Sequence, residues 1–372
     1  MRASMEWRGA KERIRGVAAT ATTVLLAACA TGQGGAPPPD LLYVAVQGDA
    51  EIAVVDMATL QEVDRIDLEA LGFTANAKPH HIAVEPDGSH WYVSLIGENR
   101  ILKFNRNNEL QDRAEFEVPG MLAVHPQEDL LLVGRSMSAV NPPQRVGVVD
   151  RGSMSVEEVD VFFPRPHAIA VSADGTRLYT ASLAVNQVGV VDLESEEMEL
   201  TEIPGPVQTM VQFAVSPDGS TVVATGQLTG RLLVFDMADP DHPALRSQVE
   251  VGGQPWHPVF SRDGRTVYFG IKVENTVVAV DVATGAVVWR TRHEGILGPH
   301  GSALSPDGRH LFVSSNGPGG MDMGEGAAPM ADHADHGGTM TGTLAVLDTR
   351  DGTVLQVLEM GENTTGVGAA AR

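Results

Sequence analysis

Cysteine is almost absent from this chain of 372 residues, because Cys29 is the only one. A single thiol excludes an internal disulfide, and without a Cys-x-x-Cys-His motif the chain cannot attach haem covalently. The N-terminal apolar run, residues 17–28, is too short to span a bilayer as a permanent helix. The sequence therefore indicates neither a disulfide framework nor a c-type cytochrome.

Basic residues are also scarce, with 26 Lys and Arg against 48 Asp and Glu, so the formal net charge is -22. A surface of that sign repels nucleic acid and anionic lipid headgroups and attracts cations. We therefore expect no nucleic-acid partner. The hydrophobic fraction of 43% is that of an ordinary globular protein and is enough to form a buried core.

The N-terminus has the composition of an export signal. Basic residues precede the short apolar run, which ends in Leu-Ala-Ala-Cys at residues 26–29. This ending resembles the bacterial lipoprotein box, in which the cysteine is lipidated and becomes the new N-terminus. We therefore predict a lipoprotein signal peptide over residues 1–28, and a lipidated Cys29 with a flexible tether over residues 29–39. The alternative is a plain cleaved signal with a chance cysteine.

The lipoprotein resemblance also implies a location. It places the mature protein at the bacterial cell envelope, facing the periplasm or the exterior, with the N-terminal lipid as its only membrane contact. The domain itself is expected to occupy residues 40–372.

An internal repeat runs along the whole of this predicted domain. Its units share stretches such as KPHHIAVEPDG, RPHAIAVSADG and GPHGSALSPDG, each followed by three short β-rich runs. Successive units are offset by 40 to 47 residues. Four short strands in a unit of that length are typical of a β-propeller blade.

The two ends of the domain complete one and the same unit. The chain enters with LLYVAVQ and EIAVVD, which match second and third strands, and ends with TTGVGAAA, which matches a first strand. We therefore predict an all-β, seven-bladed β-propeller of four-stranded antiparallel blades, in which the C-terminal strand joins the N-terminal blade and closes the ring. The repeats resemble the YVTN and YncE-like family of bacterial propellers, and this resemblance implies a fold rather than a function.

Five histidines occupy matching places at the start of the predicted inner strands. Three stand eight residues before the turn glycine of their unit and two stand one place later; in chain order the five are His80, His81, His167, His257 and His300. Because inner strands surround the axis of a propeller, these positions form a ring at its mouth, where neutral imidazoles suit copper, zinc or iron. The alternative is that they only bond neighbouring blades.

The last blade carries an insertion at residues 317–342, between its predicted second and third strands. Alternate strands of a blade reverse direction, so the insertion is expected on the same face as the histidine ring. It holds four methionines and two histidines: Met321, Met323, Met330, His333, His336 and Met340. Thioethers prefer Cu(I), whereas imidazoles accept Cu(II) or Zn(II). The composition resembles Met- and His-rich stretches of exported copper-handling proteins; the alternative is an insertion without a metal role.

Our first expectation for function is that a transition metal, copper before others, binds at this ring and insertion. The propeller of nitrous oxide reductase is similar in holding copper through histidines. This chain lacks the cupredoxin extension with cysteine ligands that accompanies that propeller, which argues against reductase activity. No catalytic residue is predicted, and an enzyme, if there is one, would be a copper-dependent oxidoreductase.

Two other functions stay open. The fold also resembles the haem-binding propellers related to nitrite reductase, where a ring histidine would bind the iron and Lys78 and Arg165 would hold propionates. The protein would otherwise be a scaffold for another envelope protein. A hydrolase such as a lactonase has the least support, because no Ser-His-Asp or paired-carboxylate motif can be defended from the spacing.

Overall fold

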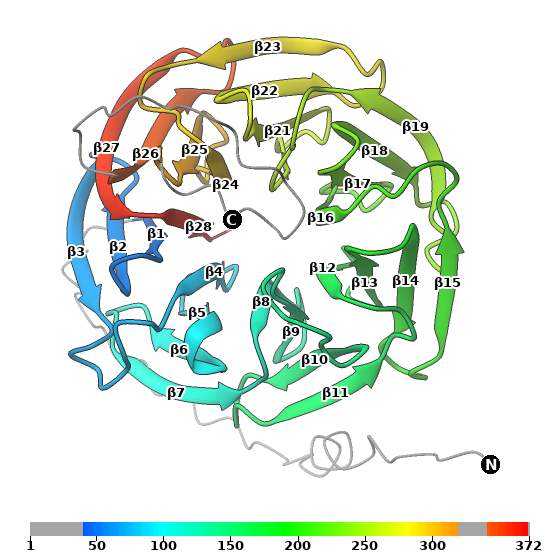
Figure 1. Ribbon diagram of the computed structural model, residues 1–372, viewed down its shortest axis with the longest axis horizontal. Helices are drawn as coiled ribbons and strands as arrows, with labels where there is room; N and C mark the ends of the chain where they lie inside the picture. The colour runs from blue at the N-terminus through cyan, green and yellow to red at the C-terminus, as the bar shows by residue number, and fades with distance from the viewer. Residues whose placement is uncertain (1–39, 319–340, 371–372) are drawn as a thin grey trace, which may run out of the picture. The chain divides into compact units, whose positions relative to one another are not determined.

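The computed structural model describes residues 40–318 and 341–370, which form a ring of seven antiparallel sheets with four strands each (Figure 1). Each sheet is one blade, so the predicted seven-bladed β-propeller is confirmed. The predictions for the signal peptide, Cys29 and the Met- and His-rich residues 321–340 lie outside the described residues. Within the described ranges, no helix is long and apolar enough to cross a membrane.

In each blade, the first and second strands lie nearest the axis of the ring. The innermost strands are β4 (Pro79–Val84), β8 (Pro119–Val124), β12 (Pro166–Val171), β16 (Met210–Val215), β20 (Val259–Phe260), β24 (Pro299–Leu304) and β28 (Thr364–Ala369). The second strands are β5 (His90–Leu95), β9 (Leu130–Arg135), β13 (Arg177–Ser182), β17 (Thr221–Gly226), β21 (Thr266–Ile271), β25 (His310–Ser315) and β1 (Leu41–Val46).

The outer two strands complete each blade toward solvent. The third strands are β6 (Arg100–Asn105), β10 (Arg145–Asp150), β14 (Gln187–Asp192), β18 (Arg231–Asp236), β22 (Thr276–Asp281), β26 (Thr341–Asp348) and β2 (Glu51–Asp56). The outermost strands are β7 (Leu110–Glu115), β11 (Val156–Asp160), β15 (Met198–Glu202), β19 (Ala244–Glu250), β23 (Val287–Arg292), β27 (Val354–Glu362) and β3 (Gln61–Asp67).

The ring closes as the sequence predicts. Strand β28, near the C-terminus, pairs antiparallel with β1, with Tyr43 opposite Gly368 and Val44 opposite Val367. The N-terminal strands β1, β2 and β3 therefore share a blade with the C-terminal strand, as Figure 1 shows by the blue and dark red strands side by side. This pairing gives β1 a hydrogen-bonded neighbour on both sides and completes the four strands of this blade.

The core lies between adjacent blades. Second and third strands are apolar on both faces and buried on both, because each blade packs against one neighbour on either side. At the junction of the first two blades, Trp91 stacks on Tyr43 at 4.4 Å and on Phe104 at 4.2 Å between ring centres. The outermost strands carry the polar residues instead, which explains their weaker apolar pattern in the sequence.

The aspartates that end the third strands have a structural role. Asp56 accepts the backbone N–H groups of Ala58 and Thr59, both at 2.9 Å, and Asp192 accepts those of Glu194 and Ser195 in the equivalent turn. A carboxylate that bonds the backbone two or three residues on stabilises the tight turn to the outermost strand. The carboxylates of these aspartates are therefore used in hydrogen bonds to the turn backbone.

Each inner strand is preceded by a residue in the left-handed conformation. The seven residues are Lys78, Val118, Arg165, Thr209, Gln254, Gly298 and Asn363. The carbonyl of each accepts the N–H of the residue that follows the second strand of the same blade, as Gln254 does from Lys272 at 2.9 Å. A positive φ is unfavourable for branched residues such as Val118 and Thr209, so this turn is imposed by the blade geometry. We call the face on which these seven turns lie the histidine face.

Candidate functional site at the centre of the histidine face

The five histidines stand where the inner strands are irregular. Blades are numbered in chain order from the one that contains β1, so β4 belongs to blade 2 and β24 to blade 7. The pairing register shifts between Pro79 and Ile82 in blade 2 and between Pro299 and Ser302 in blade 7. In a regular strand, neighbouring residues such as His80 and His81 point to opposite faces, whereas a bulge re-aims side chains. The bulge therefore explains how both members of the pair reach the centre of the ring.

A serine of the second strand supports this bulge. The hydroxyl of Ser94 accepts the N–H of His81 at 3.1 Å and donates to the carbonyl of Gly120 in the next blade at 2.8 Å. In blade 7, Ser314 accepts the N–H of Gly301 at 2.9 Å in the same way. The backbone groups that the bulge removes from the strand ladder are thus paired, as buried polar groups require.

In blade 6 the inner strand is interrupted rather than bulged. An isolated bridge pairs Pro255 with Ile271, and the regular strand β20 begins only at Val259. Pro258 has no backbone N–H to offer the ladder, which accounts for the break next to His257. Trp256 and His257 thus lie on a short irregular stretch of backbone, with exposed fractions of only 4% and 5%.

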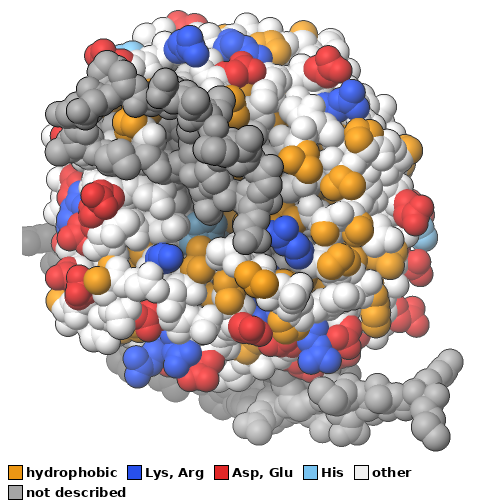
Figure 2. All heavy atoms as spheres, in the orientation of Figure 1, with side chains coloured by type: hydrophobic (Ala, Val, Ile, Leu, Met, Phe, Trp, Pro, Cys, Tyr) orange, Lys and Arg blue, Asp and Glu red, His pale blue; other side chains and the backbone are white. Residues whose placement is uncertain are grey.

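Side chains from three separate blades meet at this centre. The ring centre of His300 lies 5.4 Å from that of His80 and 4.7 Å from that of His257. His81 approaches His257 from blade 2, with 5.8 Å between ring centres. The indole of Trp256 stacks on His300 at 4.5 Å. Figure 2 shows histidine surface near the centre of one face, with most charged side chains farther out.

Hydrogen bonds select which ring nitrogens carry a free lone pair. Nδ1 of His80 bonds the side-chain oxygen of Gln47 at 3.1 Å, and Nδ1 of His167 bonds the backbone oxygen of Arg135 at 2.6 Å. Each nitrogen must donate to an oxygen acceptor, which leaves Nε2 with a lone pair. Nδ1 of His81 instead accepts the N–H of Leu122 at 3.2 Å, so its Nε2 carries the proton.

Three of these histidines have buried nitrogens without a hydrogen-bond partner among the described residues: Nε2 of His167, Nε2 of His257 and Nδ1 of His300. An unpaired buried polar atom costs free energy, and a bound ligand could supply the partner that each of these nitrogens lacks. Their position at the centre of one face is the main indication of a ligand site.

The protonation state of the cluster follows from burial. Desolvation lowers the pKa of His80 and of His81 to about 3 and that of His167 to about 4. Burial also lowers the pKa of His257 and of His300 well below the ordinary value, with further lowering by neighbouring imidazoles and Lys272. All five rings are therefore neutral near pH 7, which is the form that binds transition metals.

The fit of a metal ion can be tested on these positions. Three imidazoles bound to one ion at the usual metal–nitrogen distance have ring centres about 4.5 to 5.5 Å apart. The spacings of His300 to His80 and to His257, 5.4 and 4.7 Å, lie in that range. As the side chains stand, however, no three His, Cys, Asp or Glu side chains of the described residues are arranged to hold a metal ion. Two of the three ring spacings, those of His300 to His80 and to His257, thus suit a metal ion, and the rings would have to rotate to aim their nitrogens at it.

Sequence reasoning placed the five histidines at this centre, and the structure brings four of them into ring contact. Their role as metal ligands stays a prediction. Met321, Met323, Met330, His333, His336 and Met340 lie outside the described residues. Strand β25 ends at Ser315 on the histidine face, where the N–H of Asn316 bonds the carbonyl of Gly298 at 3.0 Å. The insertion therefore starts on this face, and strand β26 begins at Thr341.

Two polar residues of the site were missed from the sequence. Gln47 and Lys272 each directly follow the second strand of a blade, and Lys272 is only 3% exposed. The side-chain nitrogen of Lys272 lies 4.6 Å from the ring centre of Trp256. Strand direction places the residue after each second strand on the same face as the histidines. Scanning those seven positions would have found both residues.

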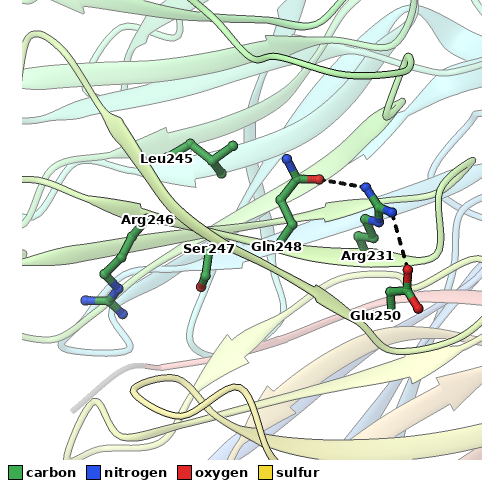
Figure 3. A pocket seen from close by; sticks show the side chains of 6 residues that line it. All are labelled: Arg231, Leu245, Arg246, Ser247, Gln248 and Glu250. Atoms are coloured by element: carbon green, nitrogen blue, oxygen red, sulfur yellow. Dashed lines mark hydrogen bonds and ion pairs between the residues drawn. The ribbon is translucent and has the colours of Figure 1, made fainter.

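A separate shallow pocket lies on the outer strands of blade 5, away from the histidines. It has a volume of about 380 Å³ and is lined by Arg231, Leu245, Arg246, Ser247, Gln248 and Glu250 (Figure 3). Arg231 bonds Gln248 at 2.9 Å and Glu250 at 3.3 Å, so its charge is already matched. No histidine or cysteine lines this pocket.

Comparison with known proteins supports the fold and leaves the family open. No family model matches the chain. A 6-phosphogluconolactonase from Enterobacter sp. (strain 638) is 31% identical over 148 residues, which cover 37% of this chain and 42% of that protein. The match thus spans less than half of the curated relative, and membership of the YVTN and YncE-like family stays a prediction.

Solved structures resemble the chain over most of its length. A functionally unknown protein from Desulfotomaculum acetoxidans DSM 771 has a TM-score of 0.69 at 15% identity, covering 89% of this chain and 98% of that one. The dihydro-heme d1 dehydrogenase NirN in complex with DHE has a TM-score of 0.61 at 15% identity, covering 91% of this chain and 77% of that one. At such identities the likeness establishes a seven-bladed β-propeller and nothing finer.

Proposed function

We propose that the central histidines bind a transition-metal ion, copper first, in a propeller held at the cell envelope by a lipid on Cys29. The observation that carries the proposal is the clustering of neutral, buried imidazoles at the centre of the histidine face, where His257 and His300 each have a buried nitrogen without a partner among the described residues. Imidazole donors without carboxylates favour copper or zinc over magnesium or calcium. The predicted Met-rich insertion favours copper between those two.

The ligands in this proposal are Nε2 of His80, Nε2 of His257 and Nδ1 of His300. His80 has the second partner that metal-binding histidines usually have, since its other nitrogen is held by Gln47. His167, held through Arg135, is available as a fourth donor. His81 is the least suited of the five, because its lone pair is used by the N–H of Leu122. A bound copper ion would supply Lewis acidity and one-electron chemistry at this point.

The test is metal analysis and copper titration of the purified chain. We expect one tightly bound copper per chain in the wild type and its loss when His80, His257 and His300 are changed together to Ala. His90→Gln, which changes a half-buried histidine at the far end of an inner hairpin, is the matched control and should leave copper binding unchanged. Equal, weak uptake by all three proteins would refute the proposal.

Haem has less support than a metal ion. The rings of His81 and His257 approach each other from different blades at 5.8 Å, so a tetrapyrrole has no space between them. It would have to lie above the cluster, beside Lys78 and Arg165. The side chain of Arg165 already donates to the carbonyl of Met137 at 2.8 Å. An absorbance spectrum of the purified protein distinguishes haem from copper directly.

The lactonase named for the curated relative is also disfavoured here. A general base works best when its pKa lies near the working pH. Burial lowers the pKa of His80 and of His81 to about 3, so these rings hold a proton too weakly for that role. Hydrolysis of 6-phosphogluconolactone by the purified chain would overturn this argument.

A docking role is the second candidate, and one observation favours it. Loops of the histidine face carry exposed apolar side chains around the cluster: Leu71, Val140, Phe162, Val207, Leu228 and Val273. Figure 2 shows hydrophobic side chains gathered on one half of the face. A photoreactive residue at position 162 should crosslink an envelope protein in cells, whereas one at position 87 on the opposite face should not. Equal crosslinking from both positions would refute docking through this face.

A further inference from the structure

One half of the histidine face carries no acidic side chain in its loops, although the chain has a formal net charge of -22. Six consecutive loops, which run from blade 3 to the start of blade 6, make up this half, and we call them the neutral arc. The loops are residues 136–144, 161–165, 183–186, 203–209, 227–230 and 251–258. They contain no Asp, Glu or Lys, and Arg165 is their one formal charge. The next loops on either side carry Glu117 and Glu274.

The opposite face of the same blades is acidic. Its loop 193–197 alone holds three glutamates, and its loop 237–243 holds two aspartates. Three acids end the outermost strands beneath the neutral arc, and two of them, Asp160 and Glu250, are ion-paired with arginines at 2.6 and 3.3 Å. Another chain of strongly negative charge is therefore repelled by the opposite face much more than by the arc.

The neutral arc also exposes large apolar side chains. Val140, Phe162 and Leu228 are 84%, 68% and 68% exposed, and they are the three most exposed large hydrophobic residues of the described chain. Val207 lies on the same arc and is 43% exposed. Exposed apolar side chains are ordinary when they are scattered singly, whereas several on one uncharged surface indicate an interaction site.

Hydrogen bonds of 2.8 to 3.1 Å join each loop of the arc to the next. In chain order, the donors are the backbone N–H groups of Val161, Leu183, Gln208, Leu228 and Val251, and the acceptors are oxygens of Gln144, Arg165, Asn186, Gln208 and Gly230. A surface that is already held in place loses little conformational entropy when it binds. The arc is therefore suited to a protein partner with a matching shape.

We infer that a second copy of this chain docks on the neutral arc, so that two histidine faces meet in a symmetric dimer. This inference rests on the docking role proposed above and not on the metal site. A two-fold interface places one patch against itself, which suits an apolar, uncharged surface and does not suit an acidic one. The six loops hold more than the roughly 20 to 30 residues that one side of a standard interface takes.

Other occupants fit the charge of the arc less well. An anionic bilayer is bound through clusters of Lys and Arg, and the arc has only Arg165, which donates to the carbonyl of Met137 at 2.8 Å. A different protein is usually selected by complementary charges around the patch.

The net charge of the chain does not prevent the dimer. A strand of six residues such as β12 is about 20 Å long, so the opposite faces of two copies would lie about 40 Å apart. The Debye length at physiological salt is about 8 Å, and repulsion between those faces is therefore largely screened.

Sedimentation velocity of the purified chain tests the inference, with Cys29→Ser to exclude a lipid and an intermolecular disulfide. We expect a dimer that forms between about 1 and 100 μM. Raising sodium chloride from about 0.05 to 0.5 M should strengthen the association, because salt screens the repulsion between acidic chains.

Two variants locate the interface. Phe162→Asp combined with Leu228→Asp places new negative charges in both copies of the patch and should raise the dissociation constant at least about tenfold. Asp tolerates the positive φ of 57° at position 162, so the fold should be kept. Val63→Asp, at a residue of β3 that is 56% exposed on the outer rim of blade 1, is the matched control and should leave the dimer unchanged.

A chain that stays monomeric up to about 100 μM, or one whose dimer is unaffected by the double substitution, would overturn the inference. A monomeric chain that binds vesicles of phosphatidylcholine and phosphatidylglycerol through Phe162 and Leu228 would assign the arc to a bilayer and overturn it as well. A crosslink in cells from position 162 to a different protein, with the purified chain monomeric, would overturn the second copy but keep the docking role. Absence of any crosslink from position 162 would refute the docking role itself.

Discussion

Histidines at the two faces of the ring differ in how their ring nitrogens are hydrogen-bonded. At the face opposite the cluster, His125 uses both ring nitrogens: Nε2 donates to Gly175 at 2.7 Å, and Nδ1 accepts the N–H groups of Gln127 and Glu128 at 3.2 and 2.8 Å. At the centre of the histidine face, His257 and His300 are equally buried, yet each keeps a nitrogen without a partner. Burial alone therefore does not distinguish these two groups of histidines, whereas the pairing of their ring nitrogens does.

The largest expected effect is the pH dependence of stability of the metal-free protein. Unfolded histidines take up protons below about pH 6.5, whereas the folded cluster, with a pKa of about 3 for His80 and about 4 for His167, stays neutral. Below about pH 6.5 the unfolded state therefore binds more protons than the folded state. The free energy of unfolding has its full value above pH 6.5 and decreases as the pH drops toward 4. Each fully buried ring contributes about 1.4 kcal/mol per pH unit.

Urea denaturation at pH 7.5, 6.5 and 5.5 measures this dependence. The variant with His80, His257 and His300 changed to Ala should lose stability less steeply between pH 6.5 and 5.5. Identical slopes in the two proteins would contradict the burial of the cluster as neutral imidazoles.

The next effect concerns the glycine that lets two inner strands approach. A Cβ at Gly366 of β28 would collide with the carbonyl oxygen of His80 on β4, and neither backbone can move freely. We expect Gly366→Ala to lower the free energy of unfolding by about 3 kcal/mol and to weaken copper binding. Gly253→Ala, on the same face, meets only ordinary contacts with Val273 and should change neither quantity. Denaturant titration checks both variants.

The third prediction compares the removal of one histidine from each face. His125→Ala removes three hydrogen bonds and should destabilise the chain by about 1 to 3 kcal/mol without changing copper affinity. His300→Ala removes a ring with an unpaired nitrogen and should cost less stability while it weakens copper binding at least tenfold. If His125→Ala weakened copper binding as much as His300→Ala, the contrast between the faces would be wrong.

The smallest expected effect belongs to the insertion. Replacing Met321, Met323, Met330 and Met340 with Ile should slow the transfer of Cu(I) to the chain but leave the final stoichiometry of tight copper unchanged. Stopped-flow transfer from a Cu(I) chelator measures the rate. Loss of the tight site in this variant would place the metal in the insertion rather than at the histidines.

The blades, the closure through β28 and the matching places of the five histidines could all be predicted from the sequence. They follow from strand length, turn chemistry and strand direction, which are local and repeat along the chain. The bulge that turns His80 and His81 toward the same centre could not be predicted, because it depends on Ser94 and on the next blade at Gly120. The direction of each nitrogen depends likewise on partners far away in the sequence, such as Arg135 for His167.

The most direct test of the account is X-ray absorption fine structure of the copper-loaded wild-type chain. We predict multiple-scattering features of about three imidazoles around each tightly bound copper, and their loss when His80, His257 and His300 are changed to Ala. A shell of sulfur or oxygen donors without imidazole in the wild type would contradict the central claim.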